Sequence, residues 1–189
     1  MSRAAMVLCV TLLSLSQVDT ADAFDGKRRG FVLGFGAGPA AWSVVEPTGR
    51  DLKLGPLTDL KIGHGISDRV LVYYTGLTMI AGLADGAEDG RLVILPSVGV
   101  RYYRKGQSPS SFGEIGAGFA IADDPAANEI NFVGGFVPHL GIGYEMGNHV
   151  SFEGVAFAGR LKSASDVPQG DFFKRLFWGF AVVVQVLAY

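Results

Sequence analysis

The chain has 189 residues, of which 49% are hydrophobic and 11% aromatic, and its formal net charge is −2. That hydrophobic fraction excludes a disordered chain, and the length suits a single domain. The near-neutral charge supplies no basic face, so we expect no nucleic-acid partner. Three scattered histidines and a single cysteine, Cys9, offer no ligand spacing, so we expect no metal site and no cofactor.

Residues 1–23 have the form of a cleaved secretory signal peptide. A short basic start precedes an apolar run, residues 4–16, that is too short to span a bilayer as a helix. An Ala-Asp-Ala sequence then gives the small-x-small pattern of a signal peptidase site, so we expect cleavage after Ala23. Residues 24–189 would form the mature domain, and an uncleaved N-terminal anchor is the alternative.

Alternation with a period of two residues dominates the mature chain. Its first segment sets large apolar residues against glycines: Phe31, Leu33, Phe35 and Ala37 against Gly34, Gly36 and Gly38. Each of these glycines would cost a helix about 1 kcal/mol relative to alanine. A strand facing a narrow lumen gains room from them instead. The same pattern recurs over 114–121 and 136–145, which favours strands throughout.

Continuing in this way predicts an all-β fold of eight antiparallel strands. No later segment has the 18 or more apolar residues of a membrane-spanning helix, and the C-terminal segment is rich in β-branched and aromatic residues. We place the strands near 30–42, 54–65, 69–81, 91–104, 111–122, 131–146, 149–160 and 172–189. Eight is the smallest size of a transmembrane β-barrel with up-and-down topology.

The predicted connections alternate in length. Those after the first, third, fifth and seventh strands are longer, at roughly 8 to 12 residues, whereas those after the second and sixth are tight. The connection after the fourth strand is intermediate. Short turns on one side and longer loops on the other are typical of an outer-membrane barrel whose termini lie in the periplasm.

The polarity of the two faces separates a membrane barrel from a secreted, lipocalin-like barrel. A soluble barrel has apolar side chains inside and polar ones outside. Here the large apolar face is opposed by glycine, charged residues and histidine, which indicates an apolar exterior and a polar, glycine-lined interior.

The last strand allows two orientations. Counting from an outward Tyr189 directs Gln185 towards lipid, whereas counting from outward Trp178 and Phe180 directs Gln185 and Tyr189 into the lumen. The two alternatives exclude each other unless a bulge lies between them.

The chain resembles the small outer-membrane β-barrel proteins of Gram-negative bacteria, the broad group of OmpA-like and OmpW-like barrels. The signal peptide, the opening strand GFVLGFGAG over 30–38, the paired glycine strands and the C-terminal strand ending in Tyr189 carry the resemblance. It implies an outer-membrane location after cleavage, with lipid and lipopolysaccharide as neighbours. It also implies that Tyr189 is the recognition signal for the barrel-insertion machinery, although Leu187 stands where such proteins carry a second aromatic residue.

The face assignment predicts an inward cluster of charge near the periplasmic turns, made of Asp59, Lys61, Arg101, Glu114, Glu145 and Glu153. Buried charges need partners, so a structural salt-bridge plug is the favoured interpretation. The alternative is a gate that opens when Arg101 or Lys61 exchanges carboxylate partners.

His149, Ser151 and Glu153 share a face and have the residue types of a hydrolytic triad. Three arguments count against catalysis. The stretch lies at the periplasmic end, it faces the lumen, and successive inward positions are about 6.6 Å apart.

Two further groups lie near the predicted strand ends. Aromatic residues suit the two membrane interfaces, with Tyr102, Phe112, Tyr144, Phe152 and Tyr189 on the periplasmic side and Trp42, Phe132 and Phe172 on the outer side. The basic run Lys27-Arg28-Arg29 is expected to be a solvated periplasmic lead-in to the first strand.

We therefore expect a non-enzymatic outer-membrane barrel that is structural or that binds or passes a small, hydrophobic molecule. A lipid-modifying hydrolase is the first alternative. A surface adhesin is the second alternative. It ranks lower because the predicted outer loops are short.

Overall fold

The computed structural model describes residues 28–46, 49–81, 91–123, 132–147, 149–163 and 175–189. The predicted signal peptide, Lys27 and Phe172 lie outside these ranges. None of the described residues forms a helix long and apolar enough to cross a membrane.

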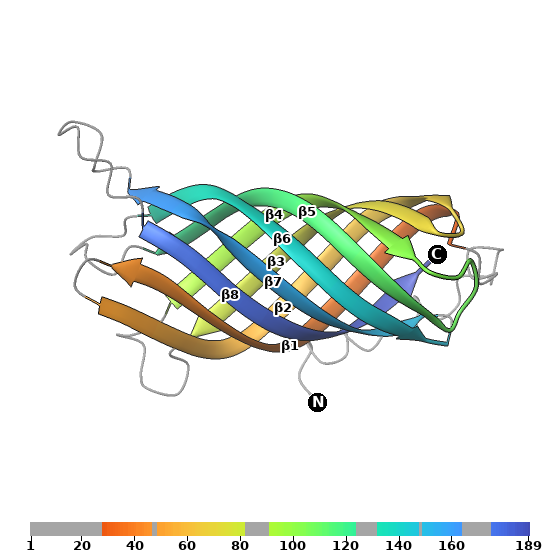
Figure 1. The fold of residues 1–189 in the computed structure, drawn as a ribbon, viewed down its shortest axis with the longest axis horizontal. Helices are drawn as coiled ribbons and strands as arrows, with labels where there is room; N and C mark the ends of the chain where they lie inside the picture. The colour runs from red at the N-terminus through yellow and green to blue at the C-terminus, as the bar shows by residue number, and fades with distance from the viewer. Residues whose placement is uncertain (1–27, 47–48, 82–90, 124–131, 148, 164–174) are drawn as a thin grey trace, which may run out of the picture.

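Eight antiparallel strands close into one barrel, in which each strand pairs with its neighbours in the sequence and β1 pairs with β8 (Figure 1). This confirms the predicted up-and-down architecture. The strands are β1 (Gly30–Glu46), β2 (Gly49–Ser67), β3 (Val70–Ala81), β4 (Arg91–Tyr103), β5 (Ser110–Asp123), β6 (Phe132–Met146), β7 (Val150–Ser163) and β8 (Arg175–Ala188).

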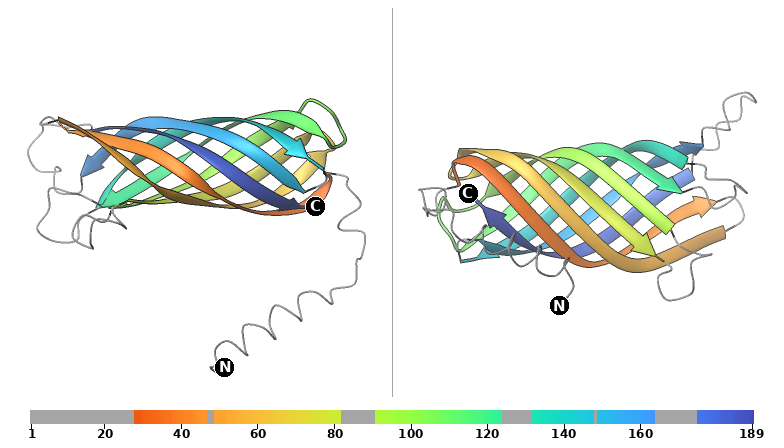
Figure 2. Two further views of the ribbon diagram at one scale, coloured as in Figure 1. Left: turned by 90° about the horizontal axis from the view of Figure 1, so that it is seen from below. Right: turned by 180° about the vertical axis from the view of Figure 1, so that it is seen from behind.

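The two ends of the barrel differ. β1 begins and β8 finishes at one end, here called the terminal end, and the opposite end is called the loop end (Figure 2). At the terminal end β2 and β3 are separated by two residues, whereas at the loop end β3 and β4 are separated by residues 82–90. The alternation of short and long connections is therefore as predicted for three of the four hairpins at the loop end.

The first hairpin departs from the prediction. β1 continues to Glu46 and β2 starts at Gly49, so two residues separate strands that were expected to be joined by a longer loop. The segments 43–46 and 49–53 contain charged and polar residues, which hide the period-two pattern. Strand pairing from Ser43 with Leu52 to Glu46 with Gly49 continues regardless, because backbone hydrogen bonds do not depend on the apolar pattern.

The outward face is an apolar band formed by every strand. Its side chains are large, and more than a third of the surface of each is exposed, as for Phe31, Phe35, Ile115, Phe136, Ile142 and Phe180. A contiguous exposed apolar surface of this extent is costly in water and favourable in hydrocarbon. The face assignment of the glycine-rich strands was therefore correct.

The interior holds two apolar clusters rather than a wholly polar lumen. The cluster at the loop end includes Trp42, Leu57, Met79, Leu95, Phe157 and Phe177, all at most 3% exposed. The smaller one at the terminal end contains Val32, Leu71, Tyr73, Tyr103, Phe112, Leu187 and Tyr189. The expected polar interior is therefore wrong for the loop-end half. In the loop-end half, both faces of β3 and β4 are apolar. The sequence pattern therefore could not show which face of each strand points into the barrel.

The predicted aromatic belts are corrected at three positions. Trp42, Phe112 and Tyr189 are buried inside the barrel, whereas Tyr102, Tyr144 and Phe152 lie on the outward face as expected. The side chain of Phe132 lies outside the described part of the structure.

Inward glycines serve two purposes. A Cβ atom at Gly36 or Gly141 would overlap side chains that fill the lumen, namely Val183 and Glu114, as the sequence pattern suggested. A Cβ atom at Gly118 would instead overlap the carbonyl oxygen of Pro96 on the neighbouring strand. Glycine at Gly118 therefore permits a close approach of two backbones.

Gly118→Val is expected to prevent closure of the barrel, because its side chain would collide with the β4 backbone. Gly76→Val is the matched control, since a Cβ atom at this outward position meets nothing within 4 Å. Heat-modifiable migration of refolded protein in detergent gels measures closure. Normal migration of the Gly118 variant, or loss of it in the Gly76 variant, would contradict this account of the glycines.

Candidate functional site

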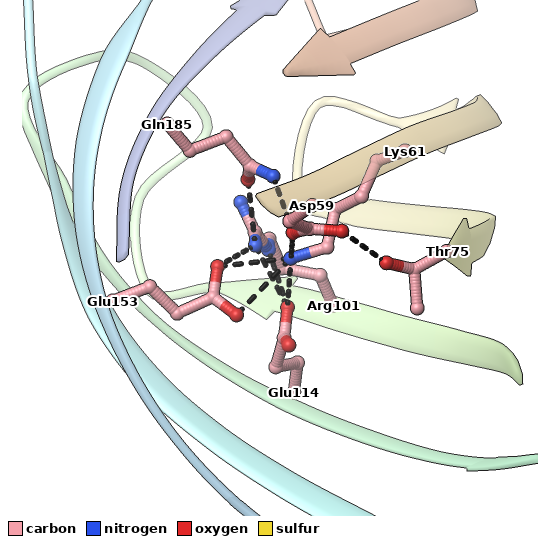
Figure 3. A network of polar contacts seen from close by, with 7 residues as sticks. All are labelled: Asp59, Lys61, Thr75, Arg101, Glu114, Glu153 and Gln185. Carbon is pink, nitrogen blue, oxygen red and sulfur yellow. Dashed lines mark hydrogen bonds and ion pairs between the residues drawn. The ribbon is translucent and has the colours of Figure 1, made fainter. Parts of the chain in front are cut away.

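Five of the six predicted charged residues meet inside the terminal-end half of the barrel (Figure 3). Asp59 and Lys61 come from β2, Arg101 from β4, Glu114 from β5 and Glu153 from β7. All are at most 6% exposed. Alternation directs each inward, and closure of the barrel brings four strands together around one centre.

Lys61 contacts all three carboxylates. Its Nζ atom lies 3.0 Å from both oxygens of Glu153. The same nitrogen lies 3.2 Å from Asp59 Oδ2 and 3.4 Å from Glu114 Oε2. The ammonium group therefore donates hydrogen bonds to Glu114 and Glu153 and forms an additional ion pair with Asp59.

Arg101 binds two of the same carboxylates. Its Nε and Nη2 atoms donate to Glu114 Oε2 at 2.9 and 2.8 Å. Nη2 also donates to Glu153 Oε2, and to Gln185 Oε1 at 3.1 Å. The guanidinium carbon lies 3.9 Å from the centre of the Phe112 ring, which covers the group on one side. The pairing of Arg101 with Glu114 follows from register, because these residues are directly opposite on β4 and β5.

Two uncharged residues complete this network, and the sequence reasoning did not include them. Gln185 Nε2 on β8 donates to Asp59 Oδ2 at 2.9 Å, and Thr75 Oγ1 on β3 donates to Asp59 Oδ1. The inward orientation of Gln185 depended on the undecided register of β8. The network, defined as Asp59, Lys61, Thr75, Arg101, Glu114, Glu153 and Gln185, joins six of the eight strands.

Glu145 is inward and buried but has a separate partner. Arg28 donates from Nε and Nη2 to its two carboxylate oxygens at 3.1 and 2.8 Å. Arg28 Nη1 also donates to the carbonyl oxygens of Asp68 and Lys105, and its guanidinium lies 3.8 Å from the centre of the Tyr103 ring. The inclusion of Glu145 in the charge cluster is therefore corrected.

Arg28 is likewise no solvated lead-in, since it is 2% exposed. Burial opposes its charge, but the hydrogen bonds and charge of Glu145 outweigh this effect and raise its pKa. Its neighbour Arg29 does lie at the surface, paired with Asp68 at 3.0 Å. The two arginines are consecutive, so only the tertiary structure distinguishes them.

The end of β8 takes the second of the two predicted orientations. Trp178 and Phe180 face outward, while Gln185 is buried and Tyr189 is 4% exposed on the lumen side. The Tyr189 ring lies 5.6 Å from that of His149, centre to centre, and burial raises the pKa of the Tyr189 phenol. Its role as an assembly signal stays a prediction.

His149, Ser151 and Glu153 do not form a catalytic triad. Ser151 Oγ has no hydrogen-bond partner among the described residues. Glu153 accepts from Lys61 and Arg101, and His149 Nδ1 lies 2.9 Å from the carbonyl oxygen of Leu187. In the described part of the chain, no group of three or more histidine, cysteine, aspartate or glutamate side chains could hold a metal ion.

The chain has the fold of the small eight-stranded outer-membrane β-barrels of Gram-negative bacteria. Neisserial surface protein A superposes with a TM-score of 0.55 at 14% identity, covering 84% of this chain and 96% of that one. Ail, the attachment invasion locus protein of Yersinia pestis, gives 0.53 at 11% identity, covering 84% and 99%. No family model and no curated protein sequence matches the chain.

Arg101→Ala is expected to destabilise the barrel by about 3–5 kcal/mol, because it removes one of the two donors that the buried carboxylates of Glu114 and Glu153 share. Urea unfolding in lipid vesicles, followed by tryptophan fluorescence, measures the change. Arg160→Ala on the exposed face of β7 is the control, with an expected change within about 0.5 kcal/mol. Equal stability of the two variants would show that the network contributes nothing to folding.

Proposed function

We propose that the protein is a structural, non-enzymatic barrel of the bacterial outer membrane whose lumen is closed to solutes. The proposal rests on the buried side chains that occupy the interior at successive levels of the described barrel. In order from the terminal end, the lumen contains the Arg28–Glu145 pair, the charge network and the apolar core. An eight-stranded barrel has an interior just wide enough for side chains to fill.

The location rests on the outward apolar band and on the fold. The terminal end, with its short turns, would face the periplasm. Membrane lipid and lipopolysaccharide would contact the band, which includes a hollow of about 840 Å³ lined by Leu140, Ile142, Phe152 and Phe180 among others. The barrel-insertion machinery would read the C-terminal strand that ends in Tyr189. Flotation of the protein with outer-membrane vesicles tests this location.

Passage of a small hydrophobic molecule is the weaker candidate. Such a ligand would have to displace packed side chains, including the stacked rings of Phe157 and Phe177, whose centres are 5.3 Å apart. Burial of each aromatic or leucine side chain stabilises the folded barrel by roughly 1.5–3 kcal/mol, so opening this core is costly.

The wild-type barrel is expected to show no steady conductance in planar bilayers. Arg101→Ala is expected to stay closed as well, since the apolar core at the loop end is a second seal that the substitution leaves intact. Heat-modifiable migration confirms that each sample is folded before recording. Stepwise currents through the wild type would contradict the closed barrel, and currents through the Arg101 variant alone would support the gate.

Refolded protein is expected to hydrolyse neither phospholipid nor lipid A, and Ser151→Ala is expected to match the wild type in stability. The hydroxyl of Ser151 is fully buried without a hydrogen-bond partner among the described residues, so its removal sacrifices no bond. Lipase assays in mixed micelles measure the first point. Hydrolysis that Ser151→Ala abolishes would overturn the non-enzymatic assignment.

A further inference from the structure

The charge network has more carboxylates than cations. Asp59, Glu114 and Glu153 face Lys61 and Arg101, and all five side chains are at most 2% exposed. With every group ionised, the network would carry one uncompensated negative charge. An unpaired buried charge costs several kcal/mol, so a folded barrel needs a compensating positive charge at this centre.

The other groups that face the centre do not supply that charge. Tyr73 on β3 places its ring 5.1 Å from Lys61 Nζ and is uncharged, as are Thr75 and Gln185. His139 on β6 is 2% exposed, and neither of its ring nitrogens has a hydrogen-bond partner among the described residues. A protonated imidazole would need acceptors for two N–H groups, so His139 is neutral here. Arg28 is already neutralised by Glu145.

Asp59 has hydrogen-bond donors of its own. It accepts hydrogen bonds from Thr75 and Gln185, which donate to neither glutamate, and it also lies beside Lys61. The competition for shared donors is therefore strongest between the two glutamates.

Glu114 and Glu153 share their donors. The Oε2 atoms of both side chains contact the same nitrogen of Arg101 and the same ammonium nitrogen of Lys61. Two carboxylates converging on common donors repel each other, and one proton held between them removes the repulsion. We propose that Glu114 and Glu153 form a proton-binding site that holds one proton at neutral pH and makes the network electrically neutral.

Infrared spectroscopy of the refolded barrel at neutral pH tests the site directly. The expected result is a carbonyl stretching band of a protonated carboxyl group, which is well separated from carboxylate bands. Glu153→Gln is expected to abolish it. Absence of the band in the wild type would overturn the proposal.

Stability provides a second, independent readout with a matched pair of variants. Glutamine reproduces a protonated glutamate, with one acceptor and one donor, so Glu153→Gln is expected to leave the urea midpoint at pH 7 equal to or above that of the wild type. Glu145→Gln removes a one-to-one partner of Arg28, and its folding equilibrium constant is expected to fall at least about a hundredfold. Equal losses in the two variants would overturn the proposal.

The dependence on pH has a definite sign. If the folded state holds a proton that the unfolded chain has released, raising the pH favours unfolding. Above the ordinary range of a free glutamate, the folding constant of the wild type relative to Glu153→Gln is expected to fall about tenfold per pH unit while the infrared band persists. A flat ratio, combined with a wild-type stability that depends on the identity of added monovalent cations, would show a bound cation in place of the proton.

Discussion

Every feature of the protein depends on the need to satisfy backbone hydrogen bonds within a band of apolar surface. Strands can do so in hydrocarbon only when the sheet has no edge, and the pairing of β1 with β8 removes the edge. Closure with eight strands then fixes the width of the interior. That width admits side chains and little else, so the content of the barrel is decided by which residues point inward.

The interior is filled in two chemically different ways. The loop-end half is packed with apolar side chains, which need no partners, whereas charged groups occupy the terminal-end half and must satisfy one another. The polar contacts consequently join residues far apart in the sequence, such as Gln185 with Asp59 and Arg28 with Glu145. Strand pairing joins neighbours around the wall, and the lumen contacts join strands across it.

The sequence predicted the strands and the inward faces wherever glycine or charge alternated with large apolar residues. This was enough to place Asp59, Lys61, Arg101, Glu114 and Glu153 together. It failed where that contrast disappears: Leu77 and Leu95 lie inside strands that are apolar on both faces, and the extension of β1 to Glu46 runs through polar residues. Arg28 precedes the first strand, so no periodicity could reveal its burial. Contacts of this kind depend on turns brought together by the whole barrel.

The position of Arg28 has a consequence for the order of events during assembly. Its acceptors are the carbonyl groups of Asp68 and Lys105 and the carboxylate of Glu145, which belong to two separate turns and to β6. Arg28 precedes all of them in the chain, yet it can reach them together only once β2 to β6 stand side by side. Arg28 is therefore among the first described residues to be synthesised, but its buried contacts form only after five later strands have assembled.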